Sequence, residues 1–465
     1  MSGAARSADV AVLGAGPAGL AAALGIARSG RSVVVVERHS LPGGLAGSFE
    51  VAGVRVDYGS HRLHPSCDPA ILGELRRLLG ADLQLRVRHG RIRLANRWVA
   101  FPPRAGDLVR RLPAPIAVRL ASDALTAPLR RRGGDTFADV VRAGLGPTML
   151  DELYGPYVEK LWGLPTTALD GELARRRVGA RSPAALAGKL VRRGDRPGSV
   201  FFSPRRGYGQ ISDALAAAAA DAGADLRFGA DVSRVDVQGD RVMLTTATGE
   251  RMDAALVASS IPVPALVAMG GDSVPVSVRD AAEALEFRGL VLVYLVLTRP
   301  RWTEFDAHYF PALDTLASRV SEPKNYRDGD DPEDVTVLCA EIPCTAGDAT
   351  WSAPDDALAA RVADDLARAG LDRLVPDAVT TRRVAKAYPT YRRGFAERFA
   401  AVDGWLAEQQ HLVTFGRQGL FAHDNAHHAL AMGWALAECL RPDGSLDRQR
   451  WRQAREGFRA HVVED

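Results

Sequence analysis

The order of apolar and polar residues at the start of the chain predicts a strand, a helix and a second strand. Val10–Leu13 is a short apolar run, and Pro17–Ser29 has the alanine-rich composition of a helix. Ser32–Val36 is a β-branched run that ends at Glu37. Runs of these lengths in this order are typical of two parallel strands joined by a helix. The chain therefore opens with a predicted βαβ unit.

The pattern then changes twice along the chain. Phe49–Asp57 alternates apolar and polar residues, which predicts one strand leading into Tyr58–His64. Helical patterns predominate from Asp68 to Arg196, with breaks at prolines and glycines. After a predicted helix at Gly207–Ala222 the strand pattern returns, with predicted strands at Asp225–Phe228, Val232–Val237, Arg241–Thr246 and Ala254–Ala258.

Two apolar strands and two helices are predicted in the second half. Phe287–Thr298 and Thr336–Ile342 are candidates for a second sheet, and Trp351–Ala369 is helical in pattern. Leu412–Phe415 reads as a strand and Asn425–Leu440 as the last long helix. We therefore predict an α/β protein with two interleaved, discontinuous domains. The nucleotide-binding domain comprises 1–66, 205–285 and 400–465, and an α+β substrate or cap domain, with helices over a mixed sheet, comprises 67–204 and 286–399.

Composition agrees with a globular protein. Of 465 residues, 47% are hydrophobic and 25% charged, which argues against extended disorder. The four cysteines are too few and too scattered for a disulfide framework or a zinc site, so we expect a reducing, cytoplasmic location; they are Cys67, Cys339, Cys344 and Cys439. Neither a signal-peptide core in Met1–Arg6 nor a bilayer-spanning apolar run is evident. We expect a soluble or at most peripheral protein.

The positive charge is concentrated in one part of the chain. The net charge is +3, but Ile71–Gln210 contains 26 Lys and Arg against 12 Asp and Glu. This excess is either a solvated arginine-rich surface or a region that attracts an anionic substrate or membrane. Arg130–Gly134 is accordingly either a basic loop or a contact with lipid headgroups. We expect a small-molecule substrate, with an anionic one as an option, and no nucleic-acid partner.

A glycine motif between the first strand and the first helix predicts a dinucleotide site. Gly14 permits the tight turn, Gly16 lets a diphosphate approach the backbone, and Gly19 lets the helix pack on the strand. The helix then begins at Pro17 and Ala18, where its free N–H groups and positive dipole end favour phosphate. Glu37 follows Gly16 by 21 residues, the spacing of a carboxylate that binds ribose hydroxyls.

A second glycine-rich loop narrows the cofactor to FAD. Glu37-Arg38 is followed by Gly43-Gly44-Leu45-Ala46, a Glu-Arg-x4-Gly-Gly arrangement. It resembles the start of a large flavoprotein group that includes amine oxidases, protoporphyrinogen oxidase, carotenoid desaturases and UDP-galactopyranose mutase. The resemblance implies a Rossmann-type domain of the glutathione-reductase-like kind that binds FAD non-covalently. It also implies that Gly416-Arg417 and Asp424-Asn425, before the last helix, return to the flavin, and that Val232 contacts the cofactor.

Four further stretches resemble the mutase branch of that group. They are Gly59-Ser60-His61-Arg62-Leu63-His64, Tyr157–Gly163 with Arg177 and Arg181, Arg206–Gln210, and Tyr388–Tyr391 together with the Gly416-Arg417 segment. The resemblance places Gly59, Ser60 and His61 near the flavin ring and Arg177 and Arg181 on a substrate diphosphate. His423–His428 departs from the mutases, which carry a tyrosine followed by Asp-Met.

The candidate site residues each have an ordinary structural alternative. His61 and Tyr391 are the candidate catalytic residues, and the candidate substrate-binding residues are Arg62, Trp162, Arg177, Arg181, Arg205, Arg206, Tyr208 and Tyr388. Arginines can grip phosphate through two hydrogen bonds, and the aromatic side chains can stack or donate a hydrogen bond near the ring. The alternatives are solvated arginines and packed aromatic residues. His427 and His428 point roughly 100° apart on a helix, so we expect no metal site there.

Three functions remain open at this stage. The first is an FAD-dependent oxidoreductase that transfers a hydride from an organic, sugar-type or natural-product-type substrate to flavin N5. The second is a redox-neutral sugar-nucleotide mutase or isomerase. The third is a flavoprotein-fold module that binds without catalysis.

Overall fold

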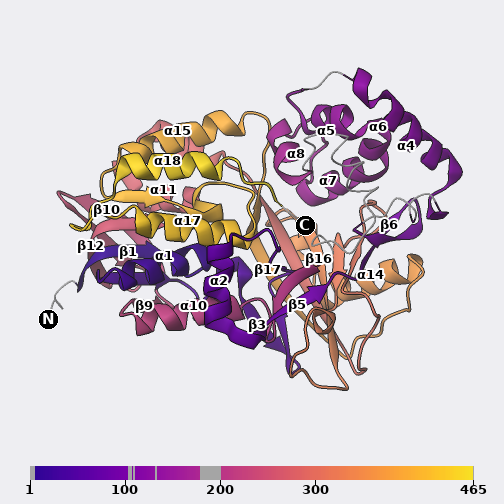
Figure 1. Cartoon of the computed structure of the whole chain (residues 1–465), viewed down its shortest axis with the longest axis horizontal. Helices are drawn as coiled ribbons and strands as arrows, with labels where there is room; N and C mark the ends of the chain where they lie inside the picture. The colour runs from indigo at the N-terminus through magenta and orange to yellow at the C-terminus, as the bar shows by residue number, and fades with distance from the viewer. Residues whose placement is uncertain (1–5, 103–106, 108–109, 131–132, 179–199, 464–465) are drawn as a thin grey trace.

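Two sheets, one in each lobe, organise the molecule. The computed structural model describes residues 6–102, 107, 110–130, 133–178 and 200–463 (Figure 1). Within these residues each of the two large sheets has seven strands, and helices cover them. The predicted mixed α/β fold is confirmed.

The first sheet is built around the N-terminal strand. Its order is β10 (Val232–Gln238), β11 (Arg241–Thr246), β12 (Arg251–Ser259), β1 (Arg6–Leu13), β2 (Val33–Glu37) and β9 (Asp225–Phe228), with β18 (Leu412–Thr414) pairing with β12. β1 is parallel to both of its neighbours. Val10, Ala11 and Val12 are fully buried, because helices and strands cover both faces of this central strand. That explains its continuous apolar sequence.

Two helices contact each other closely against this sheet. α1 (Pro17–Arg28) lies along α17 (Ala426–Glu438), and α10 (Gln210–Asp221) also packs on α1. A methyl group added to Gly433 would lie 2.3 Å from the carbonyl oxygen of Ala18, and one added to Gly25 would lie 2.6 Å from the Cβ of Ala437. The two glycines therefore allow the backbones of α1 and α17 to approach.

The second sheet carries the other lobe. Its order is β17 (Ala378–Pro389), β13 (Phe287–Leu297), β16 (Thr336–Cys344), β15 (Arg319–Ser321), β14 (Ala307–Tyr309), β6 (Gly90–Leu94) and β7 (Arg97–Phe101). α14 (Asp355–Arg368) packs Leu358 and Val362 into the apolar cluster on one face. The hairpin of β3 (Ser48–Val51) and β4 (Val54–Asp57) packs on the other face.

A group of helices, the helical subdomain, completes this lobe. It consists of α4 (Ala114–Thr126), α5 (Phe137–Leu145), α6 (Pro147–Met149), α7 (Gly155–Trp162) and α8 (Gly171–Arg177), drawn in purple at the upper right of Figure 1. The remaining strands and helices are α2 (Pro69–Leu79), β5 (Leu83–Val87), β8 (Val200–Pro204), α11 (Val263–Met269), α12 (Val276–Glu283), α13 (Ala349–Ser352), α15 (Phe395–Glu408), α16 (Gly416–Gly419) and α18 (Arg448–Phe458). Among the described residues, no helix has the length and apolar character that a membrane crossing requires.

Three sequence predictions differ from the observed elements. Phe49–Asp57 is a hairpin, because Ala52 and Gly53 adopt positive φ and turn the chain. The helical prediction for Asp68–Arg196 is wrong for β5, β6 and β7; in β6, apolar residues alternate with arginines. Ile92 and Leu94 face the core while the intervening arginine does not, which is the period of a strand. β17 was not expected, because its polar sequence lacks an apolar run.

The contact between α1 and α17 gives a stability prediction. Gly433→Ala places a methyl group into the backbone of α1, so we expect it to lower the free energy of unfolding by about 1–3 kcal/mol. Gly404→Ala is the matched control, because Gly404 lies within α15 and an added methyl would meet no atom within 4 Å. Urea unfolding of both variants measures the difference. Equal stability of the two variants would contradict the close contact.

Candidate functional site

The first glycine loop leaves one stretch of backbone open. Gly14 has φ +98°, and a methyl group added to Gly19 would lie 1.9 Å from the carbonyl oxygen of Gly14. Around Gly16, by contrast, the nearest atom to an added methyl would be 4.0 Å away, at the carbonyl oxygen of Gly43. Gly14 and Gly19 are thus required by the fold, whereas Gly16 leaves space that a ligand can fill.

Glu37 and the second glycine loop converge on the first. Glu37 is buried at the end of β2, and its carboxylate accepts hydrogen bonds from the backbone N–H of Ala15 (2.8 Å) and of His39 (2.9 Å). Gly43, with φ +117°, donates its N–H to the carbonyl oxygen of Ala15 at 2.8 Å. The short 3-10 helix η1 (Gly44–Ala46) follows. Both glycine loops and the Glu37 carboxylate are therefore joined through the backbone of Ala15.

These residues fit the diphosphate and ribose of FAD. α1 begins at Pro17 without a side-chain cap and without an acidic residue in its first turn, so its N–H groups and dipole can receive an anion. Each oxygen of Glu37 has one hydrogen bond and retains a lone pair for a ribose hydroxyl. Ala18, Leu45 and Ala46 line the same loops, and the exposed Arg38 lies beside them. Val232 begins β10, just after Ala230 bonds the carbonyl of Glu37.

The C-terminal segment returns to this site. A methyl group added to Gly416, which has φ +71°, would lie 2.9 Å from the Cβ of Ala18, so α16 sits beside the start of α1. Arg417 donates to the carbonyl oxygen of Ala387 at 2.9 Å. Its Nε has no hydrogen-bond partner among the described residues, and burial, ahead of other effects, lowers the pKa of its guanidinium.

The side chains of His61 and Tyr208 pack against each other and form one wall of the candidate site. The two rings stack with centroids 5.3 Å apart, and the backbone N–H of Tyr208 donates to Asp57 at 2.9 Å. Burial lowers the pKa of His61 to about 4, with Arg319 and Arg417 adding to the effect against the opposing Asp57. Burial also raises the pKa of Tyr208. Both side chains are therefore uncharged near neutral pH.

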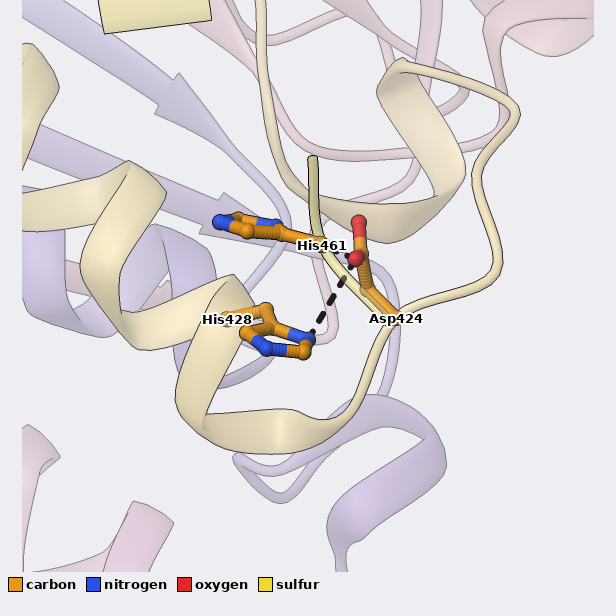
Figure 2. A group of neighbouring side chains, drawn as sticks. All are labelled: Asp424, His428 and His461. Carbon is orange, nitrogen blue, oxygen red and sulfur yellow. Dashed lines mark hydrogen bonds and ion pairs between the residues drawn. The ribbon is translucent and has the colours of Figure 1, made fainter. Parts of the chain in front are cut away.

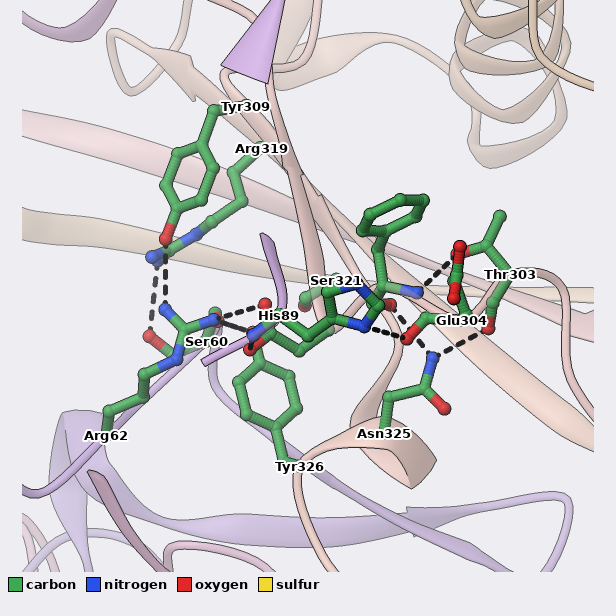
Figure 3. A network of polar contacts seen from close by, with 12 residues as sticks. Ser60, Arg62, His89, Thr303, Glu304, Tyr309, Arg319, Ser321, Asn325 and Tyr326 are labelled. Atoms are coloured by element: carbon green, nitrogen blue, oxygen red, sulfur yellow. Dashed lines mark hydrogen bonds and ion pairs between the residues drawn. The ribbon is translucent and has the colours of Figure 1, made fainter. Parts of the chain in front are cut away.

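A polar network holds the segment that carries His61. The backbone N–H of Ser60 donates to Glu341 at 2.8 Å, and Arg319 binds the same carboxylate through two hydrogen bonds of 2.8 and 2.9 Å. Arg319 also donates to the carbonyl oxygen of Ser60 at 3.2 Å (Figure 3). Gly59 lies directly against Glu341. The sequence analysis missed both Arg319 and Glu341, since single charged residues in β15 and β16 gave no motif.

Arg62 belongs to this network. It donates to the hydroxyls of Tyr309 (2.9 Å) and Tyr326 (3.1 Å) and pairs with Asp306 at 3.0 Å (Figure 3). Although burial opposes its charge, these three partners raise the pKa of Arg62. These contacts hold the segment that carries His61 in place. A role of Arg62 toward a substrate stays a prediction.

Arginines and aromatic rings gather at a second group of predicted residues. The guanidinium of Arg177 lies 5.2 Å from the ring of Trp162 and 5.8 Å from that of Tyr388, and Arg417 lies 5.3 Å from the same tyrosine ring. Trp162 is buried and donates to the carbonyl oxygen of Pro389. The structure thus brings together residues of α7, α8, β17 and α16 that the sequence placed in one site.

His423 joins this group, although the sequence analysis assigned it no role. Its ring lies 5.9 Å from Trp162 and 4.7 Å from Tyr391, edge-on to both. Burial, reinforced by Arg177 and Arg417, holds its pKa well below the ordinary value. A neutral imidazole therefore lies between the arginines and the aromatic core.

The other predicted substrate residues lie elsewhere or outside the described residues. The hydroxyl of Tyr391 donates to the carbonyl oxygen of Phe421 at 2.9 Å, and its ring stacks on Phe395 at 3.9 Å. These contacts support a role in positioning the 421–423 segment, and a catalytic role stays a prediction. Arg205 pairs with Asp82, and the exposed Arg206 also lies near Asp82. Arg181 falls outside the described residues.

Asp424 forms a cluster with two histidines. Its carboxylate lies 3.4 Å from Nδ1 of His428 and 3.1 Å from Nδ1 of His461, whose rings stack (Figure 2). The potential ligand atoms of this group lie within 4.8 Å of one another. However, Nδ1 of His428 already accepts the backbone N–H of Asn425 at 3.2 Å, which engages the lone pair that a metal would need. We assign the cluster to hydrogen bonding.

Residues 459–463 also contact the helical subdomain. The backbone N–H of Val463 donates to the carbonyl oxygen of Arg176 at 2.8 Å, and Arg176 donates to the carbonyl oxygen of Arg459. Together with the bond from His461 to Asp424, these contacts join α8 to the residues that precede α17.

Comparison with known proteins agrees with this geometry. A family model for flavin-containing amine oxidoreductases matches residues 17–434. A phytoene dehydrogenase of Streptomyces griseus is 30% identical over 298 residues, which cover 55% of this chain and 54% of that protein. The match thus spans about half the length of this curated relative. The flavoprotein group expected from the sequence is confirmed.

Solved structures share the fold along nearly the whole chain. Reduced UDP-galactopyranose mutase superposes with a TM-score of 0.81 at 19% identity, covering 98% of this chain and 100% of that one. A putrescine oxidase variant gives a TM-score of 0.67 at 17% identity, covering 94% and 99%. FAD, as predicted, is the cofactor. Its binding by the glycine loops and Glu37 stays a prediction, which the open backbone at Gly16 and the geometry of Glu37 support.

The low pKa of His61 gives a prediction about pH. Between about 4 and its ordinary value of 6.5, the unfolded chain binds a proton at His61 that the folded protein does not bind. Lowering the pH through this range therefore favours unfolding. We expect the thermal unfolding midpoint of the FAD-loaded protein to fall as the pH is lowered from 6.5 to about 4. His61→Gln should weaken this dependence of the midpoint on pH. The exposed His39→Gln is the control, and parallel curves for wild type and His61→Gln would contradict the assignment.

Proposed function

Because the chain belongs to the flavin-containing amine oxidoreductase family, we propose that it is an FAD-dependent oxidoreductase acting on a small organic substrate. The match of the family model to residues 17–434 carries this proposal, since it includes the second glycine loop and the segments that carry His61, Arg177 and Arg417. It begins at Pro17, directly after Gly14 and Gly16 of the first loop. FAD, when bound, supplies the hydride-accepting isoalloxazine ring. Non-covalent attachment is part of the proposal.

The protein contributes binding, orientation and a dry surface. The glycine loops and Glu37 hold the diphosphate and ribose, while the network of Arg319 and Glu341 fixes the position of His61. His61, His423 and Tyr208 are all held uncharged by burial. Removal of a hydride needs a positioned C–H bond and the exclusion of water more than a charged base, so these walls suit the reaction.

Arg177 and Arg417 support an anionic group on the substrate. Both approach the ring of Tyr388, and the nearby positive charge of Arg177 contributes to the lowered pKa of Arg417. In the described part of the chain, no carboxylate forms a salt bridge with Arg417. An anionic group between the two arginines would offset their repulsion and could take bidentate hydrogen bonds. We propose that the substrate places a carboxylate or phosphate there.

The same observation favours a second candidate, a redox-neutral mutase. Cationic arginines beside tryptophan and tyrosine also suit a sugar nucleotide, whose diphosphate would meet Arg177 and whose base or sugar would stack on Trp162. Hydride transfer and mutase chemistry therefore predict different products from one binding site.

Product mass separates the two candidates. The FAD-loaded protein is mixed without oxygen with UDP-galactopyranose and, separately, with a panel of organic carboxylates and phosphates, and the flavin absorbance is followed. Bleaching together with a product lighter by two hydrogens supports the oxidoreductase. An unchanged mass, with turnover only after dithionite reduction, overturns it in favour of the mutase. A colourless protein that cannot be reconstituted with FAD overturns both.

Arg177 provides a direct test of the anionic site. We expect Arg177→Ala to raise KM for an anionic substrate by about tenfold or more, since a hydrogen bond to a charged group contributes roughly 1.5–3 kcal/mol. The control is Arg175→Ala, because Arg175 lies on the same helix but is exposed and pairs with Glu172. Steady-state kinetics measure both variants. An unchanged KM for Arg177→Ala would remove the anionic site from the proposal.

A further inference from the structure

Helix α4 carries a stripe of exposed apolar side chains on one side. Val118 is 67% exposed and Leu125 is 82% exposed, and none of the residues of α4 is buried. Leu129, in the 3-10 helix η3 (Ala127–Leu129) that continues α4, is 84% exposed. Val118 and Leu125 are seven residues apart and so share one side of the helix. We call Val118, Leu125 and Leu129 the outer face of α4.

Two charged side chains of α4 also contact the rest of the protein. Asp123 accepts the backbone N–H of Thr148 at 2.8 Å, at the start of α6. Arg119 pairs with Glu152. Ile116 and Leu120 are half-buried on the side of Asp123, so Val118, Leu125 and Leu129 form a second apolar stripe, on the exposed side of the helix. An exposed apolar stripe of this kind marks an interaction surface.

Figure 1 places α4 at the rim of the helical subdomain. α6 and α5 lie between α4 and α8, which carries Arg177. The outer face is therefore separate from the cofactor site and from the arginines beside Tyr388. A ligand on this face would leave the proposed site accessible.

Positive charge flanks the outer face. The described residues from 107 to 130 contain four arginines and two aspartates. Arg111 pairs with Asp107 and Arg119 with Glu152. A cleft of about 480 Å³ lies between α4 and α5 and is lined by Arg130 and Arg142. Asp123 and Asp139 also line the cleft, and both accept hydrogen bonds within the protein, from Thr148 and Thr136. Nη2 of Arg130 is buried and has no partner among the described residues. This unpaired donor is the feature of the cleft that suits an anionic group.

We propose that the outer face of α4 docks on an anionic phospholipid surface, with lipid phosphates held by the arginines around the cleft. An interfacial helix combines an apolar stripe that enters the headgroup region with basic residues that attract anionic lipids. The arginines argue against a second copy of this chain as the occupant, because a two-fold contact would bring the same positive patches together. The helix lies on the membrane and does not cross it.

Vesicle flotation of the full-length, FAD-loaded protein tests this surface. We expect binding to vesicles of phosphatidylcholine and phosphatidylglycerol in equal parts, weaker binding at high salt, and little binding to phosphatidylcholine alone. Leu125→Asp combined with Leu129→Asp should lower the partition constant by about tenfold or more, because two leucines no longer enter the lipid. Retained flavin absorbance shows that the variant is folded.

Val375→Asp is the matched control, because Val375 is 80% exposed but lies in the loop before β17. It should bind vesicles as the wild type does. Absence of wild-type binding, or an equal loss in both variants, would overturn the proposal. A wild-type dimer in sedimentation equilibrium that Leu125→Asp converts to a monomer would identify the face as a self-association surface instead. None of these readouts depends on the substrate or on turnover.

Discussion

Ala15 uses both of its main-chain groups to join three separate parts of the cofactor site. Its N–H binds the carboxylate of Glu37, and its carbonyl oxygen receives the N–H of Gly43. The first loop, the end of β2 and the second loop are thereby fixed to one another without any side chain of Ala15 itself. The open backbone at Gly16 and the uncapped start of α1 are useful only because this arrangement holds them in place. The close approach of α17 then secures α1 from its other side.

A buried carboxylate has a comparable role between the lobes. Glu341 of β16 binds the backbone of Ser60 and the guanidinium of Arg319, so the segment carrying His61 is attached to the second sheet. Removing one partner would leave an unpaired buried charge, which is far more costly than the net gain of forming the pair. The pair of Glu341 and Arg319 therefore determines the position of the segment that carries His61. Its net contribution to the free energy of unfolding is small compared with the cost of breaking it.

The sequence allowed prediction of those parts of the fold that have a local signature. β1, α1 and β2 have the correct period and are observed, and the fixed offsets of their glycines allowed a dinucleotide site to be predicted between them. Arg319 and Glu341 could not be found, because each is a single charged residue within a strand and their pairing depends on sheet register. His423 lay in a segment that was noticed, but its position between Trp162 and Tyr391 follows from tertiary packing. β17 was missed because its polar residues are accommodated by pairing with the apolar β13.

The pairing of β1 with β12 has a consequence for folding during synthesis. Arg6 lies opposite Met252 in this parallel pair, and β18 and α17 join the same lobe only near the end of the chain. β1 therefore cannot complete its sheet until β12 and β18 have been synthesised. Contacts of such long sequence separation slow folding and leave apolar strands exposed during synthesis. We therefore expect FAD to bind only after β12, β18 and α17 have been made.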